Sequence, residues 1–169
     1  MFKQLLAFAL FLASTYTLSC ELVVRVEDYA AQSHRDENQQ WQGIDIELIK
    51  TLLNQAGCTY KFVPIRWGRA LKMLETGNLD MMMSVSKTTE RSKYIHFIGP
   101  QGIEQILVVS KASPKIILNR FEDIKSTPLP IGVQEGAFYG SDFTKFVSSL
   151  SNPDTYFLKC QIITLNFLF

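Results

Sequence analysis

The stretch DMMMSVSKTTERSKYIHFIGP, from Asp80 to Pro100, decides the fold that we expect for this chain. Its apolar run Met81 to Val85 is too short for an independent helix and suits a buried strand, with the methionines as packing residues rather than a soft-metal site. A turn rich in hydroxyl side chains follows and leads to Arg91. Hydroxyls at the carboxyl end of a strand, with a guanidinium just beyond, can bind a small anion such as a carboxylate. The alternative is a polar surface loop with a solvated arginine.

The residues before this stretch alternate between two patterns, short β-branched runs and apolar residues at helical spacing. We expect strands at Leu22 to Glu27, Thr59 to Pro64 and Leu79 to Val85, and helices at Ile44 to Ala56 and Trp67 to Leu74. Gly57 suits the end of the first helix as a cap. The order β-α-β-α-β is the signature of a parallel sheet with helices across its faces.

Parallel sheets of this kind bind ligands at the carboxyl ends of their strands. Those ends are Asp28-Tyr29, Arg66-Trp67 and the segment from Ser84 to Arg91. Three loops that are distant in sequence are therefore expected to meet at one rim. This favours a ligand-binding role for Arg91, while Tyr29 and Trp67 remain either pocket walls or core residues.

The alternating pattern restarts after Gly99-Pro100. We expect strands at Gln105 to Ser110 and Pro130 to Val133, and helices at Arg120 to Ile124 and Gly140 to Leu150. The loop Gln134 to Gly140 lies at a strand end and opens a helix, so that its free backbone N–H groups can face an anion. The alternative is a loop with turn glycines only, because the glycine spacing matches no nucleotide-binding fingerprint.

Residues 1–20 are predicted to be a signal peptide for export. Lys3 supplies the positive charge, and Leu5 to Ala13 is an apolar run too short to span a bilayer. Cleavage is compatible with a site after Ser19 or after Cys20. Lipid anchoring at Cys20 is the alternative to soluble export, but Thr17 stands where an aliphatic residue is usual.

The composition excludes some partners and leaves the cysteines open. A formal net charge of +1 gives no reason to expect nucleic acid or anionic lipid as a partner. The two histidines, His34 and His96, have no ligand at metal-binding spacing, so we expect no metal and no cofactor. Cys58 and Cys160 can pair in an oxidising compartment, but two separate thiols are favoured because they fall in different predicted lobes.

Taken together, these features resemble the solute-binding protein family 3, the periplasmic receptors of polar amino-acid ABC transporters. The matching pieces are Trp41 to Leu48, Gly77 to Asp80, Ser86 to Arg91 with His96-Phe97, and Pro130 to Gly136. The resemblance implies an α/β fold of the type II periplasmic-binding kind, with two lobes of mainly parallel sheets flanked by helices and a cleft that closes by a hinge. It divides the chain into the signal peptide (1–20), a first lobe (21–102), a partial second lobe (103–155) and a divergent apolar tail (156–169).

The resemblance also implies roles for particular residues. Ser86 and Arg91 are expected to hold a ligand carboxylate, with Ser84 in the same pocket. Tyr29 is expected to pack on the ligand side chain, Trp67 to lie near a second aromatic wall, and the Gly136 backbone to face the carboxylate from the other lobe. The implied function is non-catalytic capture of a small polar, amino-acid-like ligand in the periplasm, by a monomer that delivers it to an inner-membrane ABC permease.

The chain also departs from this family pattern. Its last stretch, from Cys160, is apolar and unlike the family, and it lacks the return crossover and the acidic residue for a ligand ammonium. We therefore hypothesise a truncated or frameshifted copy that binds weakly or not at all, with a native strand in the tail as the alternative. Two other functions stay open: a periplasmic lyase, with Glu27, Asp28 or Glu135 as its acid or base, and a ligand-sensing input module.

Overall fold

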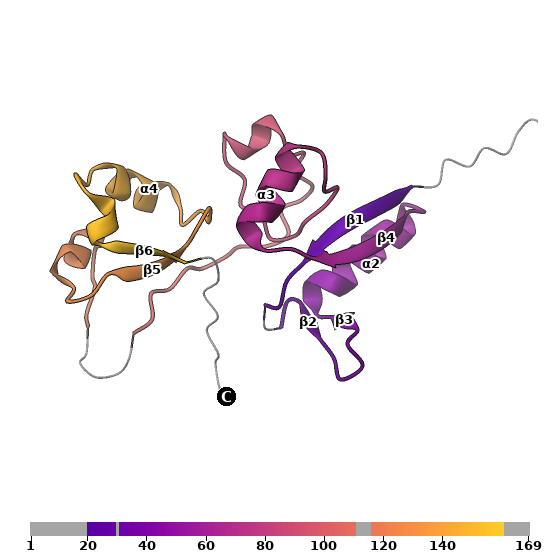
Figure 1. Ribbon diagram of the computed structural model, residues 1–169, viewed down its shortest axis with the longest axis horizontal. Coiled ribbons are helices and arrows are strands. Elements are labelled where there is room, and N and C mark those ends of the chain that lie inside the picture. The colour runs from indigo at the N-terminus through magenta and orange to yellow at the C-terminus, as the bar shows by residue number, and fades with distance from the viewer. Residues whose placement is uncertain (1–19, 30, 111–115, 161–169) are drawn as a thin grey trace, which may run out of the picture.

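The structure is a computed structural model that describes residues 20–29, 31–110 and 116–160 (Figure 1). The predicted signal peptide, apart from Cys20, and the last nine residues of the predicted tail lie outside the described residues. In the described part of the chain, no helix has the length and apolar character needed to cross a membrane.

The first lobe is built on two parallel strands, β1 (Glu21–Val26) and β4 (Thr59–Pro64), which pair from Glu21↔Thr59 to Val26↔Pro64. The helix α2 (Ile44–Gln55) connects them, and α3 (Trp67–Glu75) follows β4. The helical spacing of the apolar residues in α2 places one stripe against the sheet, where Ile49 and Leu53 join Val24 in the buried core. These four predicted elements are confirmed within one residue or two at their ends.

The segment before α2 contains a short antiparallel hairpin, β2 (His34–Arg35) with β3 (Trp41–Gln42), which was not among the predicted elements. The hairpin leads into α2 through Gly43, whose φ is 123°. A Cβ at this position would lie 2.4 Å from the carbonyl oxygen of Gln32. Glycine is therefore needed here for both its backbone conformation and its lack of a side chain.

The third predicted strand, Leu79 to Val85, is reduced to one parallel bridge, Val24↔Met81. The bridge places this segment on the side of β1 opposite β4. The Asp80 carboxylate accepts a hydrogen bond from the Val23 N–H at 2.7 Å, and Ser84 has a left-handed φ of 56°. The predicted strand was too long for two reasons. The Asp80 side chain accepts the Val23 N–H, which a strand backbone would otherwise accept, and the backbone turns away at Ser84.

The second lobe has a parallel pair, β5 (Ile131–Gln134) with β6 (Phe157–Cys160), in register from Ile131↔Phe157 to Gln134↔Cys160. Its other elements are the α-helix α4 (Ser141–Ser148) and two 3₁₀ helices, η2 (Phe121–Ser126) and η3 (Pro153–Thr155). Its core is Ile124, Phe146 and Phe157. Strand β6 lies in the stretch that was predicted to be a divergent apolar tail. The sequence alone does not show that these residues pair with β5, and this pairing is what makes them a strand.

The predicted strand at Gln105 to Ser110 is absent. Side chains of this segment such as Leu107 and Val108 are exposed, and no described strand lies beside it. An apolar, β-branched pattern predicts a strand only when a neighbouring strand completes its hydrogen bonds. The segment instead forms the connector between the lobes.

A disulfide joins Cys20 to Cys58, and Cys160 is free. The expectation that Cys58 remains a separate thiol was therefore wrong. The cause is the register of the first sheet: Glu21 pairs with Thr59, so the residue before each of them lies beside the other. Their Cα atoms are 4.6 Å apart, which is within the range that a disulfide spans.

Candidate functional site

The guanidinium of Arg91 lies at the point where the two lobes meet. Arg91 opens the short 3₁₀ helix η1 (Arg91–Lys93) and is only 7% exposed. Its Nη1 donates to the carbonyl oxygen of Ser86 at 2.8 Å, and its Nη2 donates to the carbonyl oxygen of Gly136, in the second lobe, at 2.7 Å. The Thr88 hydroxyl accepts a hydrogen bond from the Arg91 backbone N–H at 3.2 Å, which fixes the turn.

This buried cation has no carboxylate partner among the residues that the structure describes. None of the ion pairs includes Arg91, and both of its guanidinium acceptors are neutral carbonyl groups. Burial lowers the pKa of the Arg91 guanidinium, because desolvation disfavours its charged form. The site therefore presents a desolvated positive charge that an anion would stabilise.

Trp67, the first residue of α3, lies against the same guanidinium. Its Nε1 donates to the carbonyl oxygen of Gly136 at 3.2 Å, so that this one oxygen accepts from both Trp67 and Arg91. The Arg91 guanidinium lies 5.7 Å from the centroid of the indole ring, and the Arg25 guanidinium lies 5.5 Å from it. Gly136 has a left-handed φ of 74°, which glycine adopts without strain.

Arg25 belongs to this group, although it was not among the site residues predicted from the sequence. It forms an ion pair with Glu27 and donates from Nε to the carbonyl oxygen of Ile65 at 2.9 Å. Burial lowers the pKa of Arg25 to about 10. Val24 and Val26 face the core, so strand alternation indicates that Arg25 points to the other face of β1. Alternation alone does not show that the Trp67 ring lies over Arg25.

The other predicted site residues are placed differently. The contact from Ser86 to Arg91 is made by its carbonyl group and not by its hydroxyl. The Ser84 hydroxyl donates to the buried Asp45 carboxylate at 2.9 Å. Tyr29 is 57% exposed and pairs through its backbone with Ser33, and no ring contact joins it to Trp67 in the described part of the chain. The structure thus brings Arg91, Trp67 and Gly136 together and leaves Tyr29 apart.

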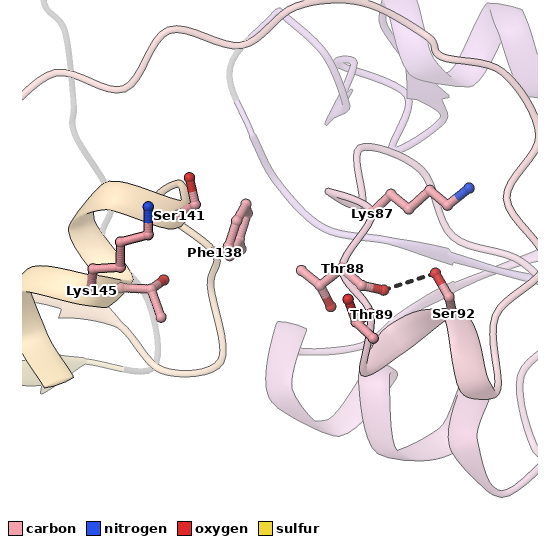
Figure 2. Close-up of a pocket in the computed structure, with 8 residues that line it drawn as sticks. Lys87, Thr88, Thr89, Ser92, Phe138, Ser141 and Lys145 are labelled. Carbon is pink, nitrogen blue, oxygen red and sulfur yellow. Dashed lines mark hydrogen bonds between the residues drawn. The ribbon is translucent and has the colours of Figure 1, made fainter.

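An open hollow of about 590 Å³ lies between the two lobes, beside the turn that leads to Arg91 (Figure 2). Figure 2 shows Phe138, Ser141 and Lys145 on one side and the Lys87 to Thr89 segment with Ser92 on the other, and Thr144 completes the lining. The Ser92 hydroxyl donates to the Thr88 carbonyl oxygen at 2.8 Å. Most of these side chains are hydroxyls or amines, so the walls can hydrogen-bond a polar solute.

A smaller hollow of about 280 Å³ lies at the carboxyl ends of β1 and β4, where the sequence predicted the rim of the sheet. Its lining comprises Val26, Glu27, Asp28, Arg35, Trp41, Pro64, Ile65 and Arg66. Two of these lining residues stack on each other: the Arg35 guanidinium lies 4.8 Å from the centroid of the Trp41 ring. Within residues 20–29, 31–110 and 116–160, no group of three or more His, Cys, Asp or Glu side chains is arranged to hold a metal ion.

Comparison with solved structures gives the fold its context. An ancestral amino acid-binding protein, a precursor of cyclohexadienyl dehydratase, matches with 30% identity and a TM-score of 0.66 over 84% of this chain and 62% of that chain. The arginine-bound form of a truncated ArgBP from T. maritima matches with 25% identity and a TM-score of 0.65 over 83% and 64%. An ancestral arginine-binding protein bound to arginine, at 23% identity with a TM-score of 0.64 over 84% and 61%, supports the fold alone.

The architecture is therefore the α/β type II periplasmic-binding fold, with mainly parallel sheets flanked by helices. This chain spans about three fifths of the length of these neighbours. The family model for bacterial extracellular solute-binding proteins, family 3, matches residues 22–161, which covers both lobes and ends just after β6. The chain belongs to the bacterial extracellular solute-binding proteins, family 3.

Proposed function

We propose that this chain binds a small, amino-acid-like solute through a carboxylate that docks on Arg91. The observation that carries the proposal is the buried Arg91 guanidinium, 7% exposed and bonded to carbonyl oxygens without a carboxylate partner in the described residues. A buried charge without a counter-charge is costly, and an anionic ligand removes that cost. The planar fork of arginine matches the two oxygens of a carboxylate in a way that lysine does not.

The neighbours of Arg91 supply the rest of the proposed binding site. A ligand carboxylate that reaches Nη2 replaces the Gly136 carbonyl as its acceptor. Trp67 offers a flat wall, and a ligand ammonium over its ring adds a cation–π contribution of about 1 kcal/mol. Ser84, Ser86 and Tyr29 of the same lobe complete the proposed set. Because the Ser84 hydroxyl donates to Asp45 and Tyr29 lies apart from Trp67, these two reach the solute only after a local rearrangement. The interlobe hollow beside Thr88 is the route by which the solute enters.

We further propose that the protein acts after export, in the periplasm, as a monomer that delivers its solute to an inner-membrane ABC permease. Membership of an extracellular solute-binding family supports this location. The Cys20–Cys58 disulfide is compatible with it, because disulfides persist in oxidising compartments. The disulfide also uses the Cys20 sulfur that lipid anchoring would need, which favours soluble export.

A lyase is the second candidate, favoured by the neighbour that is a precursor of cyclohexadienyl dehydratase. Of the predicted acids and bases, Glu27 and Asp28 line the smaller hollow. Glu27, however, forms an ion pair with Arg25, so its carboxylate is already engaged within the protein. We therefore propose a non-catalytic binding protein.

A thermal-shift screen of the twenty amino acids and of small carboxylic acids tests the proposal. The screen extends to millimolar concentrations, because the small second-lobe core predicts weak binding. The wild type and Lys93→Ala are compared with Arg91→Ala and Arg91→Lys. Lys93 is the matched control, since it lies in the same short helix and is exposed.

We expect at least one carboxylate to stabilise the wild type and Lys93→Ala and to leave both Arg91 variants unchanged. Arg91→Lys keeps the charge and loses the fork, so it answers the question if Arg91→Ala does not fold. The proposal is wrong if no compound stabilises the wild type, or if the Arg91 variants respond as strongly as the control.

A further inference from the structure

Asp45 is a buried carboxylate that receives hydrogen bonds from two separate segments of the chain. It lies in the first turn of α2 and is 7% exposed. The Ser84 hydroxyl donates to Oδ2 at 2.9 Å, and the Gln101 Nε2 donates to Oδ1 at 2.5 Å. No ion pair includes Asp45 within the described residues. Its side-chain partners are therefore these two neutral donors, one on each carboxylate oxygen.

The first donor, Ser84, begins the turn that carries Arg91. Its φ of 56° lies in the left-handed region, which is unfavourable for a residue with a Cβ. Such a conformation persists where surrounding contacts hold it, and the hydrogen bond to Asp45 is the contact that the Ser84 side chain makes. The turn follows directly after the bridge at Met81, so this conformation decides where the chain goes between β1 and Arg91.

The second donor, Gln101, stands at the start of the connector between the lobes. It follows Gly99, with a φ of 112°, and Pro100, which together redirect the chain as it leaves the first lobe. The hydrogen bond to Asp45 joins this first residue of the connector to α2 across 56 positions of sequence. The placement of the second lobe begins from this anchored residue.

We propose that Asp45 is a positioning residue that couples the turn carrying Arg91 to the interlobe connector. One carboxylate serves both segments, so a displacement of either donor changes the support of the other. A movement of the connector, as the lobes open or close, is thereby transmitted to Ser84 and to the turn that ends at Arg91. The consequence for ligand binding rests on the proposed function, but the coupling itself does not.

Trp67 provides a ligand-free readout of this coupling. Its ring contacts the Arg91 guanidinium, and its Nε1 donates to the Gly136 carbonyl oxygen of the second lobe. Its fluorescence therefore responds to the position of Arg91 and to that of the second lobe. The chain has two tryptophans, so a Trp41→Phe background leaves Trp67 as the single emitter.

In this background, Asp45→Ala, Gln101→Ala and the double variant are compared. Each single variant is expected to shift the Trp67 emission to the red, because the contacts with Arg91 and Gly136 loosen. The double variant is expected to shift it no further than Asp45→Ala alone, because both substitutions remove the same contact. Glu47→Ala is the matched control: it lies in the same helical turn with the same charge, but it is exposed, and it should leave the emission unchanged.

A swapped pair tests the same contact without truncation. Asp45→Asn with Gln101→Glu restores an amide facing a carboxylate: the new amide N–H donates to the new carboxylate, and the amide oxygen still accepts from the Ser84 hydroxyl. The wild-type emission is expected to return in the swap, whereas Gln101→Glu alone, which sets two carboxylates together, shifts it. This swap gives the answer if Asp45→Ala does not fold.

Two results overturn the proposal. One is a lowered unfolding midpoint with unchanged Trp67 emission in the single variants, which makes Asp45 a stabilising residue only. The other is additive shifts in the double variant, which shows that Gln101 acts independently of Asp45. All these measurements are made without ligand, so a failed ligand screen overturns the proposed function and leaves this result standing.

Discussion

The two lobes contribute different kinds of group to the candidate site. The first lobe supplies side chains, with the Arg91 guanidinium and the Trp67 indole as its main parts, whereas the second lobe supplies the backbone carbonyl of Gly136. A side chain carries chemical selectivity, while a carbonyl group only completes a hydrogen bond. Under the proposed function, this difference around Arg91 assigns the recognition of the solute carboxylate to the first lobe and leaves the second lobe as a clamp.

The cores of the lobes differ in the same direction. The first lobe packs aliphatic residues such as Val24 and Ile49 between a sheet and a helix, and a disulfide closes one end of the sheet. The second lobe packs a small aromatic cluster around Phe146 on a two-stranded sheet. Both lobes have a two-stranded parallel sheet, but the first lobe adds a second α-helix and a disulfide, so the second lobe is expected to be the less stable one.

The largest expected effect concerns the disulfide of the first lobe. Cys20→Ser removes a cross-link over a sequence separation of 38 and should lower the free energy of unfolding of the first lobe by about 4 kcal/mol. Urea denaturation followed by tryptophan fluorescence measures this lobe, because both tryptophans belong to it. Cys160→Ser is the control and should have no such effect on the first lobe, since Cys160 is free. Equal losses in the two variants would contradict the comparison.

The next effect concerns the aromatic core of the second lobe. Phe146→Ala should lower the stability of this lobe by about 3 kcal/mol, the lower end for such a truncation because the core around it is small. The amide signals of β5, followed by NMR during a urea titration, report this lobe. The tryptophan transition of the first lobe should stay in place. If it moves as far as the β5 signals, the lobes unfold as one unit and the contrast between them fails.

A smaller effect is expected at the contact between the lobes. Trp67→Phe keeps an aromatic ring and removes the N–H that donates to the Gly136 carbonyl, at a cost of about 1 kcal/mol. The exchange rate of amide protons near Gly136 should rise in this variant. Trp41→Phe, which alters the β2–β3 hairpin, is the control, and a similar rise there would mean that the indole contact is not the cause.

The smallest effect is a pH dependence of the second lobe. The pKa of Asp123 lies below its ordinary value of 3.8, because the Asn119 backbone N–H and then the Arg120 side chain donate to its carboxylate. A depressed pKa in the folded state stabilises the fold above pH 3.8, and this contribution is lost as the pH falls through the lower, folded-state value. In NMR urea titrations, the urea midpoint of the β5 signals should fall between pH 6 and pH 3, and it should fall less in Asp123→Asn than in the wild type. Identical losses would exclude this contribution.

Much of the first lobe was predictable from local patterns. Apolar spacing located α2 and α3, and the β-branched run at Thr59 to Pro64 located β4. These patterns suffice because each element presents one face to a neighbour that is close in sequence. The same reasoning placed Arg91 and Trp67 at one rim, where the structure has them in contact.

The rest depended on pairings that a single sequence does not display. The Cys20–Cys58 disulfide follows from the register of β1 with β4, and β6 becomes a strand only beside β5. The left-handed turn at Ser84 and its hydrogen bond to Asp45 involve residues 39 positions apart. An apolar run at residues 105–110 predicted a strand, but strand formation requires a partner that the described chain does not place there.

The central claim is that the buried Arg91 guanidinium binds the carboxylate of a solute. Calorimetric titration of the wild type with the best solute of the screen and with its carboxamide, which has the same shape without the charge, tests this claim without altering the protein. We predict that the carboxylate binds and that the carboxamide binds at least tenfold more weakly, the loss of roughly one charged hydrogen bond. Equal affinities for the two compounds would contradict the claim.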